Sequence, residues 1–171
     1  MVDDARAVAG GGASFDAFFR AEHRRLAALA TAMCGDRETG RDVAQEALAR
    51  TYEEWDRVGA MERPGAWTRR VVVNLVRDHG RHLAVRRRRL PELARQLDRG
   101  PSPDVAALDA ETWAAVAALP ERQRIAIAIF YIGDRSVRDV AEAMGVHEGT
   151  VKTTLHAARE RLRRELSGGS G

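Results

Sequence analysis

The stretch from residue 134 to 166 limits the possible folds most strongly, because it joins two helical patterns through a tight turn. The first pattern is an apolar stripe with helical spacing, formed by Val137, Val140, Ala141 and Met144. Gly145 follows it and suits the left-handed position after a helix end. The second pattern places Val151, Leu155, Ala158 and Leu162 on one stripe of a more basic helix. Together they predict a helix-turn-helix whose second helix can enter a DNA major groove, with an ordinary α-hairpin and a solvated charged face as the alternative.

Composition favours an all-α fold. Hydrophobic residues make up 44% of the 171 residues, which is enough for packed cores, and β-branched runs are rare. We therefore expect two small helical domains joined by a flexible linker. A single cysteine, Cys34, excludes an internal disulfide. The longest apolar run, 125–132, is far shorter than the roughly 20 residues that a membrane span requires, so we expect a cytoplasmic protein.

Positive charge is concentrated in the middle of the chain. Residues 63–89 contain 9 arginines and one acidic residue, Asp78. Residues 1–62 carry 8 basic and 12 acidic side chains, and residues 90–171 carry 11 and 12. A segment with this excess is typical of a surface that meets a polyanion. The middle segment is therefore a second candidate for nucleic-acid contact.

Three helices are predicted between residue 14 and about residue 83. Ser14 is a suitable N-cap for the first, and Gly35 ends it. The second covers about 37–57, with 56–63 expected to form a loop, and the third covers 65 to about 83. The expected inward face of the second helix is Val43, Ala44, Ala47, Leu48, Thr51, Tyr52 and Trp55. That of the third is Trp67, Val71 and Leu75, with Val72 and Val76 placed less regularly.

Residues 90–103 have a linker composition, with three prolines and a glycine. Beyond them we expect a helix around Trp113 and another that Pro120 opens. The segment 125–129 alternates isoleucine with alanine, which also fits a strand. The proline start and the absence of a partner strand favour a helix.

Enzyme signatures are absent from the sequence. It contains no P-loop, no His-Glu-x-x-His and no Gly-x-Ser-x-Gly motif. His79 and His82 have a spacing that metals use, but no Cys or acidic cluster is placed to complete a site. We therefore expect no catalytic residues, no metal and no cofactor.

Three stretches resemble the bacterial RNA polymerase sigma factors of the extracytoplasmic-function (ECF) group, in particular the actinobacterial branch often called SigE-family. The first is the acidic, Gln-containing helix GRDVAQEALARTYEEW. The second is the Trp…Asn…Asp-His helix RPGAWTRRVVVNLVRDHGRH, and the third runs from LPERQRIAIAIFYIGDRSVRDVAEAMG to VHEGTVKTTLHAARERL. Their order and spacing are more specific than any one motif. The resemblance implies family region 2, with domain limits 14–85, a linker at 86–107, and region 4 at 108–166.

For region 2, the resemblance implies docking on the clamp helices of the largest polymerase subunit and capture of the −10 promoter element as a single strand. The residues implied for polymerase binding are Asp42, Gln45, Glu46, Arg50 and Glu53. Solvation alone also accounts for this outward face. The residues implied for −10 binding are Arg57, Arg63, Arg69, Arg70, Asn74, Arg77 and Arg81. An Arg-lined groove suits a single-stranded backbone, and the Asn74 amide suits a base edge, with an ordinary helix-surface asparagine as the alternative.

For region 4, the resemblance implies that the helix 148–164 reads the −35 element and that the polymerase flap is a partner. Lys152, Thr153 and His156 are the candidates for base edges. Arg135, Thr150 and Arg159 are the candidates for phosphate contact. The family often has Ser-Arg after the lysine, where this chain has Thr153 and Thr154, so the −35 sequence is not predicted.

The resemblance implies a dissociable, nucleoid-associated polymerase subunit that recognises promoters and helps to melt DNA. An anti-sigma factor is a further partner that the family allows. The Arg86–Arg89 run would lie against nucleic acid or an acidic polymerase groove, or it serves as a solubilising cluster. A stand-alone helix-turn-helix regulator is the alternative function, and an interaction adaptor is a third. The regulator would carry a ligand, receiver or dimerisation element in 14–83, where the sequence has a second basic domain.

Overall fold

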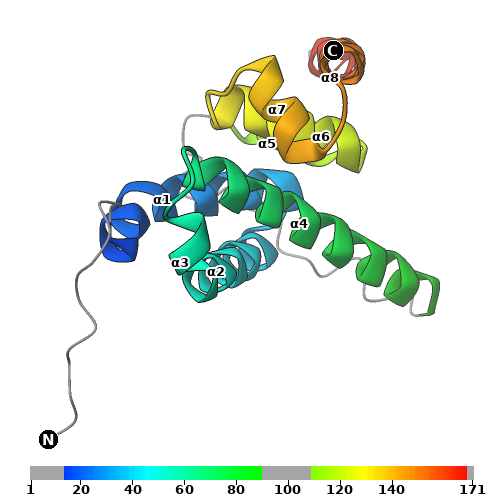
Figure 1. Cartoon of the computed structure of the whole chain (residues 1–171). Coiled ribbons are helices and arrows are strands. Elements are labelled where there is room, and N and C mark those ends of the chain that lie inside the picture. Colours follow the sequence, from blue (N-terminus) through cyan, green and yellow to red (C-terminus); the bar gives the residue numbers. More distant parts are fainter. Residues whose placement is uncertain (1–13, 90–108, 169–171) are drawn as a thin grey trace, which may run out of the picture.

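The structure is a computed structural model that describes residues 14–89 and 109–168, and every regular element in these ranges is a helix (Figure 1). The predicted all-α class is confirmed. The first range contains α1 (Phe15–Cys34), α2 (Arg37–Glu53), α3 (Trp55–Val58) and α4 (Pro64–Arg89). The second contains α5 (Ala110–Ala117), α6 (Glu121–Ile127), the π-helix η3 (Ala128–Ile132), α7 (Val137–Met144) and α8 (Glu148–Gly168). We call these ranges the N-terminal and C-terminal halves; residues 90–107 of the predicted linker lie outside the described residues.

A two-residue turn places α1 against α2. The Ser14 hydroxyl accepts the Ala17 N–H at 3.3 Å and starts α1, as predicted. Gly35 ends that helix with φ 71°, in the left-handed region, and the Asp36 carboxylate then caps α2. Gly40 lies where the two helices cross, because a Cβ at this position would stand 2.4 Å from the Thr31 Cα. The helices therefore approach more closely than any side chain at position 40 would permit.

The second predicted helix is shorter than expected. It ends at Glu53, and α3 forms a separate helical turn inside what was predicted to be the end of that helix and the start of a loop. The inward placement of Tyr52 was wrong, since 64% of this side chain is exposed. Thr51 does lie inside, where its hydroxyl donates to the Ala47 carbonyl at 2.7 Å and lies 3.2 Å from the Thr68 hydroxyl on α4.

The long helix α4 lies between the rest of the N-terminal half and α7 (Figure 1). It continues to Arg89, beyond the predicted end near residue 83, so the arginine run 86–89 has a helical backbone. Its fully buried face is Val72, Val73 and Val76, whereas the predicted inward residues Trp67, Val71 and Leu75 are half-buried. The buried face differs from the predicted one because α4 packs against α1 and α2 on one side and against α7 on the other.

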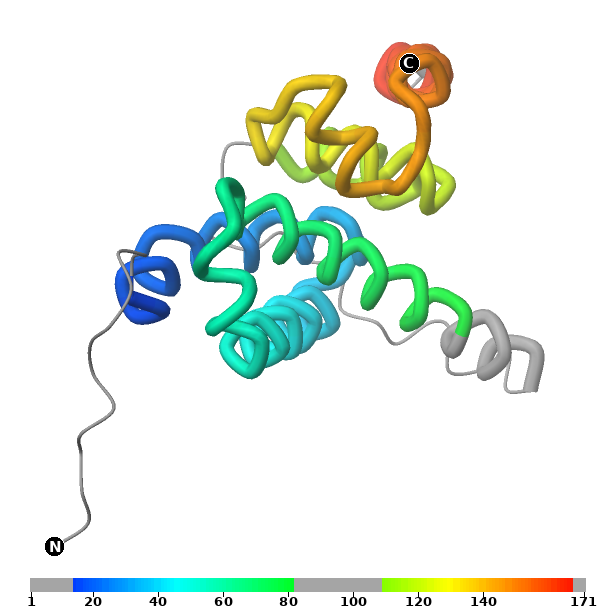
Figure 2. Tube along the Cα trace, in the orientation of Figure 1, coloured from blue at the N-terminus to red at the C-terminus, as the bar shows by residue number. Residues whose placement is uncertain are grey.

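A continuous apolar core extends through both halves. Its members in the N-terminal half include Leu26, Met33 and Val76, and those in the C-terminal half include Trp113 and Ile129. The helix α1 contacts α5, α6 and η3, as the tube in Figure 2 lets the reader follow. The two predicted helical units are thus packed against each other rather than held apart.

The predicted helix-turn-helix is present as α7 and α8. Ser136 and Asp139 form a reciprocal capping box at the start of α7, which stabilises a helix of only 8 residues. Gly145 ends it with φ 66°, as its position in the sequence predicted. The predicted stripe of α8 packs inward, with Val151, Leu155 and Ala158 buried.

The ambiguous segment 125–129 is helical, as predicted. Every residue of 125–129 is buried, Ile127 as well as Ile125 and Ile129, so both faces of this segment are covered by neighbouring helices. The helix α6 passes directly into η3, where the Gly133 N–H donates to the Ala128 carbonyl five residues earlier, at 2.9 Å. Alternating β-branched residues therefore mark a helix buried on two sides here, and not a strand.

Candidate nucleic-acid and protein-binding surfaces

The outward face of α2 is exposed and acidic. All five residues predicted for polymerase binding lie on it: Asp42, Gln45, Glu46, Arg50 and Glu53. Glu46 and Arg50 form an ion pair at 2.8 Å, one turn apart, and both remain about half exposed. Asp42 and Glu53 carry the remaining negative charge. This face can meet a basic partner without first losing a buried contact.

An apolar groove runs beside this acidic face, between α1 and α2, with a volume of about 710 Å³. Gln45 belongs to both surfaces. The groove is lined mainly by apolar and aromatic side chains: Phe15, Phe19, Ala27, Ala44, Leu48 and Tyr52. The sequence did not predict the groove, because the helical pattern assigned Tyr52 to the inward face of the second helix.

Several aromatic rings lie together at the start of α1, beside the groove. The Phe15 ring contacts the edge of Tyr52 at 5.0 Å between centroids and that of Trp55 at 5.3 Å. Phe19 stacks on His23 at 4.9 Å and is 39% exposed. Exposed aromatic rings next to charged side chains are typical of the residues that contribute most to protein–protein binding.

Five of the seven residues predicted for −10 binding are exposed: Arg57, Arg63, Arg70, Asn74 and Arg81. Asn74 and Arg70 are exposed on α4, and Arg81 is exposed and paired with Asp78. Arg57 lies over the Trp67 ring, 5.5 Å from its centroid, and pairs with Glu54 at 3.0 Å. The stacked guanidinium and indole form a flat, positively charged surface of the kind on which unpaired bases stack.

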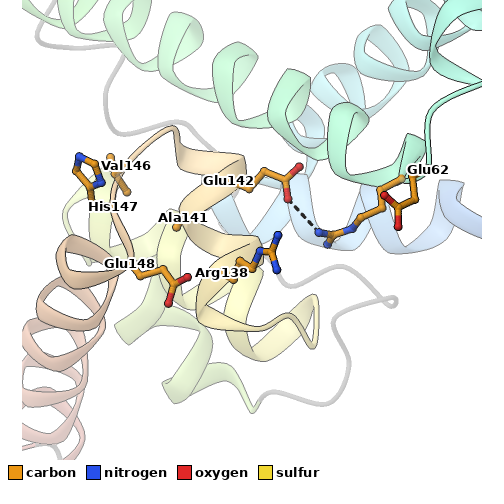
Figure 3. A pocket seen from close by; sticks show the side chains of 8 residues that line it. Glu62, Arg138, Ala141, Glu142, Val146, His147 and Glu148 are labelled. Carbon is orange, nitrogen blue, oxygen red and sulfur yellow. Dashed lines mark hydrogen bonds and ion pairs between the residues drawn. The ribbon is translucent and has the colours of Figure 1, made fainter.

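Three of the seven residues lie toward the C-terminal half: the exposed Arg63, the half-buried Arg77 and the buried Arg69. The Arg63 guanidinium contacts the carboxylates of Asp139 and Glu142, the latter at 3.1 Å. In Figure 3, the dashed line from Glu142 marks the second of these contacts. The hydrogen bond to Asp139 and both negative charges raise the Arg63 pKa. Arg77 donates from Nη2 to the Met144 carbonyl at 3.1 Å. Arg69 is buried, and this burial, followed by the positive charge of Arg135, lowers its pKa.

The residues predicted for −35 base contact share the outer surface of α8. Lys152, Thr153 and His156 are exposed, and Thr150 is exposed one turn before them. Lys152 and His156 are four residues apart and lie on one face of the helix. The Thr153 hydroxyl donates to the Gly149 carbonyl at 3.0 Å, which fixes its methyl and oxygen relative to the helix. This arrangement suits a helix that reads base edges.

The two arginines predicted for phosphate contact in this half are placed differently. Arg159 donates from Nε to the Tyr131 hydroxyl at 2.8 Å and lies 5.6 Å from the Phe130 ring centroid. Arg135 is half-buried, and its Nε has no hydrogen-bond partner. Arg135 lies close enough to Arg69 for its positive charge to lower the Arg69 pKa.

Among residues 14–89 and 109–168, no three His, Cys, Asp or Glu side chains are grouped as a metal site would require. Burial raises the pKa of the Cys34 thiol to about 12, so the thiol remains protonated at neutral pH. The helices of these two ranges are too short or too polar for a bilayer crossing.

Comparison with known families assigns the two halves. The sequence matches the Sigma-70 region 2 family over residues 18–89 and the Sigma-70 region 4 family over residues 110–162. Their order along the chain is the one that the three sequence motifs predicted. The matched ranges correspond to the two helical halves of the structure.

Curated relatives support the same assignment. The chain is 31% identical over 156 residues to the RNA polymerase sigma-E factor of Streptomyces coelicolor, covering 89% of this chain and 85% of that protein. It is 33% identical over 163 residues to the ECF RNA polymerase sigma factor SigM of Mycobacterium tuberculosis, covering 93% and 80%. Among solved structures, the sigma factor RpoE of Bartonella quintana, in complex with the anti-sigma factor NepR, has the same fold. That match has a TM-score of 0.67 at 22% identity and covers 90% of this chain and 96% of that chain.

The chain therefore belongs to the sigma-70 family. Within that family it is an ECF sigma factor that directs transcription initiation by RNA polymerase, as the resemblance predicted. It is an initiation factor and not an enzyme, and its partners are core RNA polymerase and DNA. The region 2 match favours the sigma factor over the two alternative functions, a stand-alone regulator and an interaction adaptor.

Proposed function

We propose that the acidic face of α2 and the neighbouring apolar groove bind the clamp helices of the largest polymerase subunit. The exposed carboxylates of Asp42 and Glu53 suit an Arg-rich coiled coil through charge complementarity. The groove adds an apolar surface that charge alone does not supply, with Phe19 and Tyr52 exposed along it. This juxtaposition is the observation that carries the proposal. An acidic face that served solvation alone would not require the aromatic groove beside it.

The predicted −10 surface consists of Arg57, Arg63, Arg69, Arg70, Asn74, Arg77 and Arg81. Arg57 on Trp67 offers a stacking surface, and Asn74 offers an amide to the Watson–Crick edge of an unpaired base. The arginines supply charge along the phosphates. Unpairing the DNA at this surface is the step that we assign to residues 56–81.

The predicted −35 surface is the outer face of α8. Lys152, Thr153 and His156 face bases in the major groove, and Thr150, Arg135 and Arg159 serve the phosphates. The polymerase flap is the proposed protein partner of this half. We place the domain limits at 14–85 and 108–166, with 86–107 between them, so that binding of one half raises the effective concentration of the other.

The cellular setting follows from this assignment. We propose that the protein acts in the cytoplasm at the nucleoid, where polymerase and promoters are. An anti-sigma factor is a further proposed partner, supported by the fold shared with RpoE of Bartonella quintana, whose structure contains the anti-sigma factor NepR. The shared fold supports such a partner without identifying its chemistry.

Run-off transcription with core polymerase and a promoter library tests the proposal. Asp42→Arg is expected to abolish polymerase binding while sparing −35 duplex affinity, because the charge reversal lies on α2. Glu111→Arg, an equal change on the exposed first turn of α5, is the matched control. Unchanged polymerase affinity in Asp42→Arg would show that the binding face is elsewhere. Tight duplex binding without any transcript from the wild-type chain would contradict the whole assignment.

A further inference from the structure

Two aromatic rings of η3 and one arginine of α8 form a cluster at the surface of the C-terminal half. The Arg159 Nε donates to the Tyr131 hydroxyl at 2.8 Å. The guanidinium carbon of Arg159 lies 5.6 Å from the Phe130 ring centroid and 5.7 Å from that of Tyr131. A guanidinium close to aromatic rings is attracted by their electron density. Two rings and one hydroxyl therefore hold a single guanidinium group.

The backbone that carries the two rings is a π-helix. Neighbouring side chains of an α-helix point about 100° apart, so consecutive rings rarely meet the same partner. Here the hydrogen bonds span five residues: the Gly133 N–H donates to the Ala128 carbonyl at 2.9 Å, and the Arg135 N–H to the Phe130 carbonyl at 3.3 Å. The Phe130 and Tyr131 rings meet edge to face, with centroids 4.9 Å apart. Widened turns of this kind are frequent at functional sites.

The cluster is open to a partner. Tyr131 is 54% exposed, the largest exposure of a bulky hydrophobic residue in the described part of the C-terminal half. Arg159 is half-buried, and the Nε contact to Tyr131 is its one hydrogen bond within residues 14–89 and 109–168. Its two Nη groups therefore have no acceptor in these ranges. A guanidinium that is fixed through Nε and keeps both Nη groups can still bind an anion with two parallel hydrogen bonds.

Arg159 also lies on the face of α8 that carries two of the candidates for base contact. Lys152, His156 and Arg159 are four and then three residues apart, so they follow one another along one face of the helix. At about 1.5 Å per residue, Arg159 lies roughly 10 Å along the axis from Lys152, and the major groove is about 12 Å wide. A helix whose early residues reach base edges thus brings Arg159 to the edge of the groove, where the phosphates are.

We propose that Tyr131 is a positioning residue for −35 recognition, which holds Arg159 through Nε so that its two Nη groups bind one DNA phosphate at the edge of the major groove. This role rests on the duplex-binding function proposed for α8 above. A guanidinium fork matches two phosphate oxygens, and fixing the side chain beforehand reduces the entropy lost on binding. Phosphate contacts set the register in which a helix reads bases. Tyr131 thereby affects duplex recognition without touching a base.

Duplex binding by the full-length chain tests this role without polymerase. The probe is a duplex of about 20 base pairs, roughly two helical turns, selected from a random pool by binding to the unchanged chain. Arg159→Gln should weaken binding about tenfold and lower the slope of log affinity against log salt by about one, because one phosphate contact is lost. Tyr131→Phe keeps the ring and removes the acceptor of the Nε hydrogen bond, so it should weaken binding about threefold to fivefold. Fluorescence anisotropy over a series of salt concentrations measures both quantities.

A double-mutant cycle separates positioning from packing. In the Arg159→Gln background, Tyr131→Phe should have almost no further effect on affinity, because its partner is already absent. In the background of Arg161→Gln, which removes an exposed arginine of the same helix, Tyr131→Phe should keep its full effect. Additive losses with Arg159→Gln would overturn the positioning role. So would unchanged duplex affinity of Tyr131→Phe together with a lower urea midpoint, since the pair would then serve packing alone.

Failure of the −35 surface itself gives a different result. If α8 does not bind the duplex, Lys152→Ala and Arg159→Gln should both leave the affinity of the probe unchanged. If α8 binds the duplex and Tyr131 has no part in it, both of these variants should bind more weakly, while Tyr131→Phe should match the unchanged chain. The first result would remove the function proposed for α8, and the second would remove the role of Tyr131 alone. The two failures are therefore distinguishable.

Discussion

The two DNA-facing surfaces have similar basic chemistry but differ in what their side chains contact. On α8, Lys152 and His156 are exposed to solvent. Beside α4, Arg63 contacts the carboxylates of the opposite half, and Arg69 is buried. In the proposed roles, Lys152 and His156 would meet duplex DNA without losing an internal contact, whereas Arg63 would exchange its carboxylate contacts for DNA contacts. A basic residue in a sequence indicates potential binding, and its availability depends on the partner it already has.

The largest expected effect tests whether the two halves share one core. Met33 is fully buried at the end of α1, where α6 contacts it, and Met33→Ala should cost about 2–5 kcal/mol of unfolding free energy. Leu155→Ala, inside the C-terminal half, should cost a similar amount. Because the core is continuous, urea unfolding followed by circular dichroism should show one transition for each variant. Two transitions, with Met33→Ala shifting just one, would mean that the halves unfold separately.

The next effect concerns the exposed surface of α8. Lys152→Ala should weaken binding to −35 duplex by about 1–3 kcal/mol and reduce the salt slope by about one counterion, while polymerase binding is retained. Arg161→Ala, at another exposed position of α8, is the matched control. Fluorescence anisotropy over a series of salt concentrations measures both quantities. Equal losses in the two variants would indicate general charge attraction rather than recognition by Lys152.

Acid should weaken the contact between the halves. Burial favours the neutral form of Asp139, but the Ser136 hydrogen bonds and the Arg63 contact outweigh burial and lower its pKa from 3.8 to about 2. A depressed folded-state pKa stabilises the protein above about pH 4, and that contribution is lost as pH falls toward 2. Asp139→Asn should therefore lower stability at pH 7 and flatten its fall below pH 4. Urea midpoints at several pH values measure this, and parallel curves for both proteins would exclude Asp139 as the titrating group.

The smallest effect compares two helix N-caps, Ser14 of α1 in the N-terminal half and Ser136 of α7 in the C-terminal half. Ser136→Ala removes one half of a reciprocal capping box and should cost about 1 kcal/mol. Ser14→Ala removes a single 3.3 Å hydrogen bond at the start of α1 and should cost less. Thermal or urea unfolding of the two variants gives the difference. A larger loss for Ser14→Ala would show that the end of α1 is more important to stability than the reciprocal cap.

Local chemistry made much of the fold predictable. Ser14, Gly35 and Gly145 act at the helix ends where their side chains, or their lack of one, predicted them to act. The inner face of α4 was harder to predict, because Val72 and Val73 are both buried in a helix that packs against α1, α2 and α7. A single-faced helical pattern describes a helix with one neighbour, and α4 has several.

The candidate surfaces were predictable as residue types and not as contacts. Sequence placed Arg63 and Asp139 in different domains, 76 positions apart, and gave no sign that they meet. The same applies to Arg159, whose aromatic partner Tyr131 is 28 positions away. Long-range pairing depends on how the halves pack, which a periodic pattern within one helix does not encode. The roles of these residues in DNA binding therefore stay predictions.

Gly40 has a consequence for how this protein can change over generations. A side chain there would collide with the α1 backbone at Thr31 and force α2 to shift as a whole. Substitutions at Asp42 or Glu46 alter the proposed polymerase-binding surface one group at a time, so selection can act on each separately. A substitution at Gly40 would displace all of these groups together. Partner preference can thus drift gradually on the outside of α2, while the crossing beneath it admits almost no variation.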